Sequence, residues 1–196
     1  MKTAEISKPR SRRWTVEQYA RLAELGFFED ERVELIDGSI IQMAAQKEPH
    51  VLGVTLAMRA ASKAFGDQNY YVRPPAPLRM GRRSKPEPDV AVVAGNVRDY
   101  ASKETPAGAL LVIEVSDTTL RFDRGRKAAV YARNQVADYW IVNLMDRQLE
   151  VHRDPIADPT HKWGFRYDSI QIFKPGSAVS PLAALQATIA VNDLLP

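Results

Sequence analysis

The chain has 196 residues, 45% of them hydrophobic and 26% charged, with a net charge of +3, which is ordinary for a soluble globular protein. It lacks an apolar run long enough to cross a bilayer and an apolar signal core, and the absence of cysteine excludes disulfides and thiolate metal sites. We therefore expect a cytoplasmic protein without a membrane segment, with one domain over residues 14–196 preceded by a flexible basic arm at residues 1–13.

Two local patterns define the N-terminal part of the predicted domain. Thr15 and Gln18 have the spacing of a capping box, which predicts a short helix ended by Gly26. Apolar runs on both sides of Asp37-Gly38 predict a β-hairpin over residues 32–43. These elements precede the apolar runs of the predicted core.

The middle of the chain alternates between helical and strand patterns. A helix is expected from His50 to near Gly66, and a short strand at residues 70–72. Two closely spaced prolines make residues 82–88 a loop, after which residues 90–94 form a buried strand. Residues 95–108 are a loop or a short helix.

The most apolar strand is expected at residues 109–116, buried on both faces. It is followed by a helix at 123–133, a third buried strand at 138–144 and an outer antiparallel strand at 148–153, with short strands and turns after it. Trp140 and Trp163 are interpreted mainly as core residues. The order of strand, strand, helix and strand predicts a mixed α/β sheet with a crossover helix.

Glu114 lies inside the most apolar strand, where an isolated carboxylate would be very costly. It must be paired, neutral or bound to a cation, or else carried out to water at the strand end. Asp89 starts the preceding strand, 114 − 89 = 25 residues earlier, and Ser116 shares the strand face of Glu114. Taken alone, Asp89 after Pro88 is also an ordinary turn residue.

The helix after this strand carries Asp123, Lys127 and Tyr131 at intervals of four residues, and therefore on one face. Lys127 could present its ammonium to the two acids, although an exposed Asp123–Lys127 ion pair is the simplest alternative. Tyr131 is interpreted as a packing residue.

This set of side chains suits phosphodiester hydrolysis. Carboxylate oxygens are the preferred ligands of Mg²⁺ or Mn²⁺, and such an ion lowers the pKa of a bound water and neutralises phosphate charge. A lysine can stabilise the charge that develops in the transition state. Three basic clusters form either a phosphate-attracting face or ordinary solvated surface: Lys8, Arg10, Arg12, Arg13; Arg79, Arg82, Arg83, Lys85; and Arg121, Arg124, Arg126, Lys127.

Several motifs, in order, resemble the Uma-two family of the restriction-endonuclease-like PD-(D/E)XK superfamily. They are Val33-Glu34-Leu35-Ile36-Asp37-Gly38, Pro88-Asp89-Val90, Val112-Ile113-Glu114-Val115-Ser116 and Asp123-Arg124-Gly125-Arg126-Lys127, continuing through Tyr131-Ala132-Arg133 to Tyr139-Trp140-Ile141-Val142. The resemblance spans roughly residues 15–195. It implies the restriction-endonuclease-like fold, a mixed β-sheet flanked by helices, and a metal-dependent endonuclease.

The resemblance also implies roles for single residues. The metal ligands would be Glu34, Asp89 and Glu114, and Lys127 would be the catalytic lysine. Ser116 stands where the superfamily usually has lysine, a group that this family is thought to carry on the following helix. His50 matches a histidine frequent at the start of the second helix, so His50 and Ser116 are candidate accessory residues.

The resemblance implies DNA as substrate, Mg²⁺ or Mn²⁺ as cofactor, and a two-fold homodimer. Candidate dimer contacts are the outer strand near Leu149-Glu150-Val151 and the apolar stretch Leu182 to Leu195. The alternatives are a catalytically silent nucleic-acid-binding or structural module of the same fold and a two-carboxylate hydrolase of another substrate. The latter would leave Lys127 and the basic clusters without a role.

Overall fold

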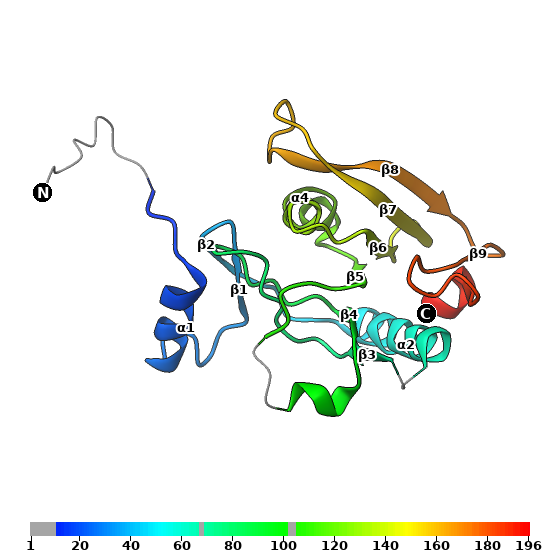
Figure 1. The fold of residues 1–196 in the computed structure, drawn as a ribbon, viewed down its shortest axis with the longest axis horizontal. Coiled ribbons are helices and arrows are strands. Elements are labelled where there is room, and N and C mark those ends of the chain that lie inside the picture. The colour runs from blue at the N-terminus through cyan, green and yellow to red at the C-terminus, as the bar shows by residue number, and fades with distance from the viewer. Residues whose placement is uncertain (1–10, 67–68, 102–104) are drawn as a thin grey trace, which may run out of the picture.

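The computed structural model describes residues 11–66, 69–101 and 105–196, and a six-stranded mixed β-sheet forms its centre (Figure 1). The neighbouring strands β5 and β6 are parallel, and the other four neighbouring pairs are antiparallel. This confirms the predicted mixed α/β fold. In spatial order the strands are β3 Tyr70–Arg73, β4 Val90–Ala94, β5 Leu111–Ser116, β6 Asp138–Asn143, β7 Gln148–Ala157 and β8 Phe165–Phe173.

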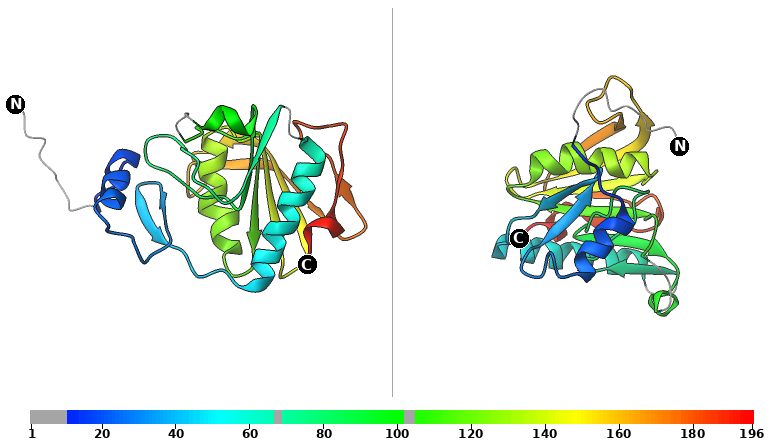
Figure 2. Two further views of the ribbon diagram at one scale, coloured as in Figure 1. Left: turned by 90° about the horizontal axis from the view of Figure 1, so that it is seen from below. Right: turned by 90° about the vertical axis from the view of Figure 1, so that its left-hand side faces the viewer.

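Helices cover both faces of the sheet, as Figure 2 shows. On one face, Ile113 and Val115 belong to a core with α2 (Glu48–Phe65) and the C-terminal residues. On the other face, Val112 belongs to a core with α4 (Ala128–Arg133). Since successive side chains of a strand point to opposite faces, all six residues of β5 are buried. The continuous apolar run in the sequence follows from this double cover.

Gly53 allows α2 to lie close to the sheet. A Cβ at Gly53 would stand 2.8 Å from Cγ1 of Val115 on β5, which is closer than packed carbon atoms approach. The absent side chain therefore sets how near the start of α2, where His50 lies, can come to the end of β5.

The hairpin formed by β1 (Val33–Ile36) and β2 (Ser39–Gln42) is a separate two-stranded sheet beside the main one. Its two turn residues, Asp37 and Gly38, have φ angles of 48° and 74°, which is the left-handed conformation of a type I′ turn and fits the predicted hairpin. An isolated bridge from Leu35 to Lys85 fastens the hairpin to the loop before β4.

Helix α1 (Val16–Glu24) begins with the predicted capping box, in which Thr15 and Gln18 bond each other's backbone. Among the described residues 11–13 of the predicted arm, none is in a helix or strand. The rest of that arm, residues 1–10, lies outside the described residues. The stretch at 95–108 contains a short 3₁₀ helix, η1 (Val97–Tyr100), where a loop or short helix was expected.

The crossover from β5 to β6 is helical but irregular. It consists of α3 (Leu120–Phe122), a π-helical segment η2 (Asp123–Lys127) and then α4. The helix thus begins three residues before the predicted start at Asp123. A π-helical turn is wider than an α-helical turn and is frequent at functional sites, and here it contains two buried charged residues, Asp123 and Lys127.

The prediction that residues 148–153 form the outer strand is wrong. Strand β7 pairs with β6 on one side and with β8 on the other, so β8 is the edge. Residues 148–152 are all buried, and polar side chains among them hydrogen-bond inside the protein instead of facing water. Beyond β8 the chain forms the expected short elements, β9 (Ala178–Val179), β10 (Ile189–Ala190) and η3 (Val191–Leu194).

In the described ranges, none of the helices combines the length and the apolar character needed to span a membrane.

Candidate functional site

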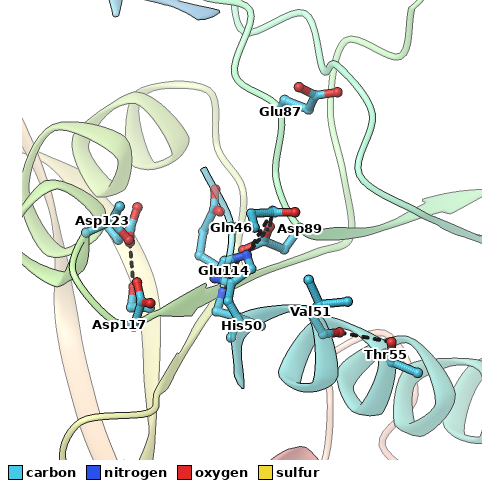
Figure 3. A network of polar contacts seen from close by, with 12 residues as sticks. Gln46, His50, Val51, Thr55, Glu87, Asp89, Glu114, Asp117 and Asp123 are labelled. Atoms are coloured by element: carbon cyan, nitrogen blue, oxygen red, sulfur yellow. Dashed lines mark hydrogen bonds and ion pairs between the residues drawn. The ribbon is translucent and has the colours of Figure 1, made fainter. Parts of the chain in front are cut away.

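A small cavity of about 40 Å³ lies where β4 begins and β5 ends, beside the hairpin and the first turn of α2. All the predicted site residues except Ser116 line it, and it also receives Asp123 from the crossover helix. Glu34, Asp89, Glu114, Lys127 and His50 come from five separate elements or loops, so the fold gathers residues that span much of the chain. Figure 3 shows three of them, His50, Asp89 and Glu114, close together.

Glu114 points to the face of β5 that α4 covers, together with Val112 and Ser116. Its Oε1 accepts a hydrogen bond from Lys127 Nζ at 2.9 Å and another from the hydroxyl of Tyr131 at 2.7 Å. The carboxylate inside the apolar run is therefore paired, as the cost of burying it requires. Lys127 and Tyr131 share a helix face, as predicted, but Tyr131 also contacts the site instead of only packing.

Glu34 reaches the same ammonium from the hairpin. Its Oε1 lies 3.2 Å from Lys127 Nζ, so the lysine joins the hairpin to β5. Neither carboxylate oxygen of Glu34 has a hydrogen-bond partner among the described residues, although both are buried. A buried carboxylate with unused acceptor capacity is uncommon, and this capacity faces a cavity lined by other acids.

Asp89 is held by groups on both of its sides. Its Oδ2 accepts a hydrogen bond of 2.9 Å from the backbone N–H of Val115. Its Oδ1 lies 3.1 Å from Nε2 of His50, and the amide of Gln46 contacts both the imidazole and that same oxygen. Figure 3 shows Gln46, His50 and Asp89 close together, with Glu87 set apart from them. Asp89 is thus a fixed residue of the site and more than a turn residue.

Asp123 and Ser116 form a second pair at the back of the site. Oδ2 of Asp123 accepts hydrogen bonds from Ser116 Oγ at 2.5 Å and from Thr119 Oγ1 at 2.6 Å. The simple alternative of an exposed Asp123–Lys127 ion pair is wrong, because both side chains are 2% exposed. Both residues belong to the π-helical segment and are buried in it.

Buried carboxyl groups outnumber buried amines in this cavity. Burial raises the pKa of Glu114 well above its usual value; Lys127 opposes this, and Asp89, Asp123 and Glu34 increase it. Burial likewise raises the pKa of Glu34 and of Asp123. Burial lowers the pKa of Lys127, but the surrounding carboxylates raise it by a larger amount. The net shift is therefore upward, and the lysine stays charged. The four buried carboxylates therefore favour any additional cation.

The donor set suits a hard divalent cation, since carboxylate oxygens are its preferred ligands, and Oε2 of Glu34 lies outside the ion pair that Oε1 makes with Lys127. As the side chains stand, no three His, Asp or Glu side chains in the described part of the chain are grouped closely enough to hold a metal ion. The ammonium of Lys127 lies instead within 2.9 Å of Glu114 and 3.2 Å of Glu34. A cation at these two carboxylates would compete with Lys127 for their oxygens.

The sequence-based prediction left four contributors out of the site: Gln46, Thr119, Asp123 and the hydroxyl of Tyr131. The four-residue spacing from Lys127 to Tyr131 was a usable signal for the last, because both then face the same strand residue. Gln46 and Thr119 lie in loops beside α2 and α3, and no periodic pattern indicated their contacts with Asp89 and Asp123.

The chain has a known architecture. It matches a crystal structure described as "a putative nuclease belonging to DUF820" from Anabaena variabilis, with a TM-score of 0.67 and 14% sequence identity, over 92% of this chain and 96% of that chain. At this identity the likeness shows the fold alone, and this is the predicted restriction-endonuclease-like α/β fold.

A comparison of the sequence with models of protein families identifies the family. The chain belongs to the Uma2 family, described as "Putative restriction endonuclease", whose model matches residues 16–192. The predicted family resemblance is thereby confirmed. The curated protein sequences contain no match to the chain.

Proposed function

We propose that this protein is a metal-dependent endonuclease that hydrolyses phosphodiester bonds of DNA. One observation carries the proposal: four buried carboxylates surround one buried lysine in a cavity at the ends of β4 and β5. Membership of the Uma2 family supports the same activity. The carboxylates are Glu34, Asp89, Glu114 and Asp123, and the lysine is Lys127.

Glu34, Asp89 and Glu114 would hold Mg²⁺ or Mn²⁺. Such an ion, when bound, lowers the pKa of a water molecule and neutralises charge on the phosphate. The protein prepares the ligands in advance: the N–H of Val115 and the imidazole of His50 fix Asp89, and Tyr131 fixes Glu114. Side chains held by such contacts lose little conformational freedom when a ligand arrives.

Lys127 would supply a fixed positive charge at the scissile phosphate. It lies on the crossover helix and not on a loop, and Glu34 and Glu114 hold its ammonium at the cavity. A preorganised charge of this kind stabilises the negative charge that develops during phosphoryl transfer.

His50 and Ser116 have positioning roles in this proposal. Burial lowers the pKa of His50, but Asp89 raises it by more, so the net shift is upward and favours the protonated imidazolium. Nε2 of His50 contacts Oδ1 of Asp89, and the N–H of Val115 donates to Oδ2 of the same carboxylate. Ser116 donates to Asp123 and keeps this fourth acid in place beside Lys127.

The test is single-turnover cleavage of supercoiled plasmid DNA with Mn²⁺, run beside a DNA-binding titration in Ca²⁺. Wild type should cleave, and Glu114→Gln should lose cleavage while keeping its fold and most of its DNA affinity. Glu150→Gln is the matched control, since Glu150 is an equally buried carboxylate that does not line the cavity. Absence of cleavage by wild type across several metals and DNA forms would contradict the proposal.

One observation favours a second candidate, a catalytically silent nucleic-acid-binding module. Lys127 already pairs with Glu34 and Glu114, and a buried ion cluster of this kind can serve the fold alone. In that case the wild type and Glu114→Gln would bind DNA equally, neither would cleave it, and divalent metal would not stabilise either protein.

We also propose a two-fold homodimer. Of the two candidate contact surfaces from the sequence, the stretch Leu182 to Leu195 is retained and the surface near Leu149-Glu150-Val151 is replaced by the edge strand β8. Leu149-Glu150-Val151 cannot be a contact surface, because β7 lies between β6 and β8 and these residues are buried. Ile170 and Ile172 on the edge strand β8 are 55% and 57% exposed, and Leu182 and Leu185 are 40% and 69% exposed. Light scattering at micromolar concentration should give about twice the monomer mass of 21.9 kDa, and a value near 21.9 kDa would refute the dimer.

A further inference from the structure

A second depression, of about 1030 Å³, adjoins the acidic cavity, and Thr118 and Thr119 line both. We call it the basic groove. Its charge is opposite in sign to that of the cavity, because its described lining residues include arginines and a lysine but no Asp or Glu. Its charged and aromatic lining residues are Arg121, Arg124, Arg126, Lys162, Phe122 and Trp163.

The cations of the basic groove fall into two groups. Arg124 is bound to Glu150 through two hydrogen bonds of 2.8 and 2.6 Å, and Arg126 donates to the carbonyl of Ile36 and the hydroxyl of Ser39, both at 2.7 Å. Arg121 and Lys162 are exposed, and among the described residues neither has an ion pair with a carboxylate. These two are free to contact an anion.

Trp163 provides an aromatic surface in the same groove. It lies in the turn between β7 and β8 and is partly exposed. The guanidinium of Arg126 lies 5.5 Å from the ring centroid and the ammonium of Lys162 lies 4.7 Å from it. Gly125 passes beneath the indole, where a Cβ would stand 3.7 Å from Nε1. Arg126 is fixed by its hydrogen bonds and supports the ring, whereas Lys162 is a flexible surface side chain that a ligand can move aside.

An aromatic ring flanked by free cations is the combination that binds single-stranded nucleic acid, with bases stacked on the ring and phosphates on the cations. Bases of an intact duplex are stacked on one another, so Trp163 can accept only an unpaired or extruded base. The groove volume of about 1030 Å³ lies just above the range of about 300–1000 Å³ that is typical of sites for drug-sized ligands. It is therefore large enough to take a nucleotide.

We propose that the basic groove binds an unpaired segment of the nucleic acid substrate, with one base stacked on Trp163 and the flanking phosphates on Arg121 and Lys162. The inference rests on the proposed function and deepens it, because it names single-stranded nucleic acid, or duplex with an unpaired nucleotide, as the substrate class. Thr118 and Thr119 line both sites, so a strand held in the groove continues directly to the acidic cavity.

The test measures equilibrium binding by fluorescence anisotropy in Ca²⁺ at fixed salt concentration. The probes are a labelled oligothymidylate, a hairpin duplex with the same number of phosphates, and an abasic oligomer of the same length. The wild type should bind the oligothymidylate more tightly than either other probe. Trp163→Ala should weaken oligothymidylate binding about 5- to 150-fold, as expected for loss of one base stacking on an aromatic ring, and should leave binding of the abasic oligomer nearly unchanged.

Trp14→Ala is the matched control, since Trp14 is also partly exposed, has Arg12 at 4.9 Å from its ring and lies outside the groove. It should bind all three probes as the wild type does. Unchanged oligothymidylate affinity in a folded Trp163→Ala protein would overturn the proposal, as would equal wild-type affinity for the abasic oligomer or tighter binding of the duplex. None of these readouts requires cleavage. If the protein cleaves nothing but Trp163→Ala weakens oligothymidylate binding, the groove proposal stands and the nuclease proposal is contradicted. If the protein cleaves DNA but Trp163→Ala binds oligothymidylate as the wild type does, the nuclease proposal stands and the groove proposal is contradicted.

Discussion

Two adjoining depressions of this protein contrast in charge and in exposure to solvent. The acidic cavity holds four buried carboxylates, whereas the basic groove presents exposed cations beside aromatic rings. They meet at Thr118 and Thr119, between β5 and the crossover helix. One short stretch of chain therefore separates a region suited to chemistry from a region suited to binding.

The contrast teaches which interactions salt and mutation should affect. Charges exposed to solvent are screened within about 10 Å at 0.1 M salt, so contacts in the groove should depend strongly on ionic strength. Charges inside the cavity are shielded from salt, but their removal leaves a partner uncompensated and is costly. The cavity should thus determine rate and stability, and the groove should determine affinity.

The largest effect is expected for Lys127→Ala. Its removal leaves Glu34 and Glu114 as buried acids without their cation, which should lower the free energy of unfolding by about 3–5 kcal/mol. If the lysine acts on the transition state, single-turnover cleavage should also fall about 10²- to 10³-fold at saturating DNA, with little loss of affinity.

Lys162→Ala is the matched control for this lysine, because Lys162 is exposed and lines the groove. It should weaken DNA binding and leave both stability and the saturated rate nearly unchanged. The contrast between the two regions would fail if Lys127→Ala weakened binding but cleaved at the wild-type rate.

The second effect is stabilisation by metal. A ligand that binds only the native state at 100 times its Kd stabilises it by about 2.7 kcal/mol, which for a domain of this size raises Tm by roughly 5–10 °C. Wild type should show this rise with Mg²⁺ or Mn²⁺, and Glu114→Gln should lose it. Glu150→Gln should keep it, because Glu150 is buried outside the cavity. An unchanged rise in Glu114→Gln would exclude Glu114 from the metal site.

A third prediction concerns Glu150, a buried carboxylate that forms an ion pair with Arg124 of the groove. Burial raises the pKa of Glu150, but His152, Arg124, Asn143 and Gln148 lower it by more, so the net pKa lies well below its usual value. Stability from such a group is complete above its unfolded pKa of about 4.3 and is lost as the pH falls through the folded pKa. Glu150→Gln should therefore cost about 1.5–3 kcal/mol at pH 7 and less below about pH 4.

Urea unfolding at pH 7 and pH 3 measures this difference, with Glu17→Gln as an exposed control whose ion pair with Arg79 lies at the surface. The control should change little at either pH. The same Glu150→Gln protein should bind single-stranded DNA as tightly as the wild type or more tightly, since Arg124 loses its internal carboxylate. A cost that grows toward acid pH would contradict the assigned direction of the shift.

Local sequence signals predicted much of the fold and of the acidic cavity. The capping box at Thr15, the turn at Asp37-Gly38 and the apolar run around Glu114 each depend on neighbouring residues, and each was confirmed. The motif order then indicated which acids converge on Lys127. The structure brings Glu34 and Glu114 to that lysine.

Features that depend on contacts between residues far apart in the sequence could not be predicted from local patterns. The outer strand was placed at residues 148–153 because their alternation is also that of an edge strand, and only the return of β8 covers them. Trp163 was interpreted as core because large aromatics usually are, yet it lies in a turn and lines the groove. The π-helical segment at Asp123–Lys127 has no sequence signature that separates it from an α-helix.

The smallest expected effect belongs to Arg121→Gln, and it isolates one contact of the groove. Arg121 is exposed and lines the groove, so its loss should remove about one phosphate contact without disturbing the core. For single strands each contact contributes about 0.7 to the slope of log K against log salt, so the slope should fall by about that amount. Arg98→Gln, an exposed arginine on η1 outside the groove, should leave the slope unchanged. Binding of oligothymidylate measured from about 50 to 200 mM salt decides between them, and equal slopes for Arg121→Gln and wild type would remove Arg121 from the path of the strand.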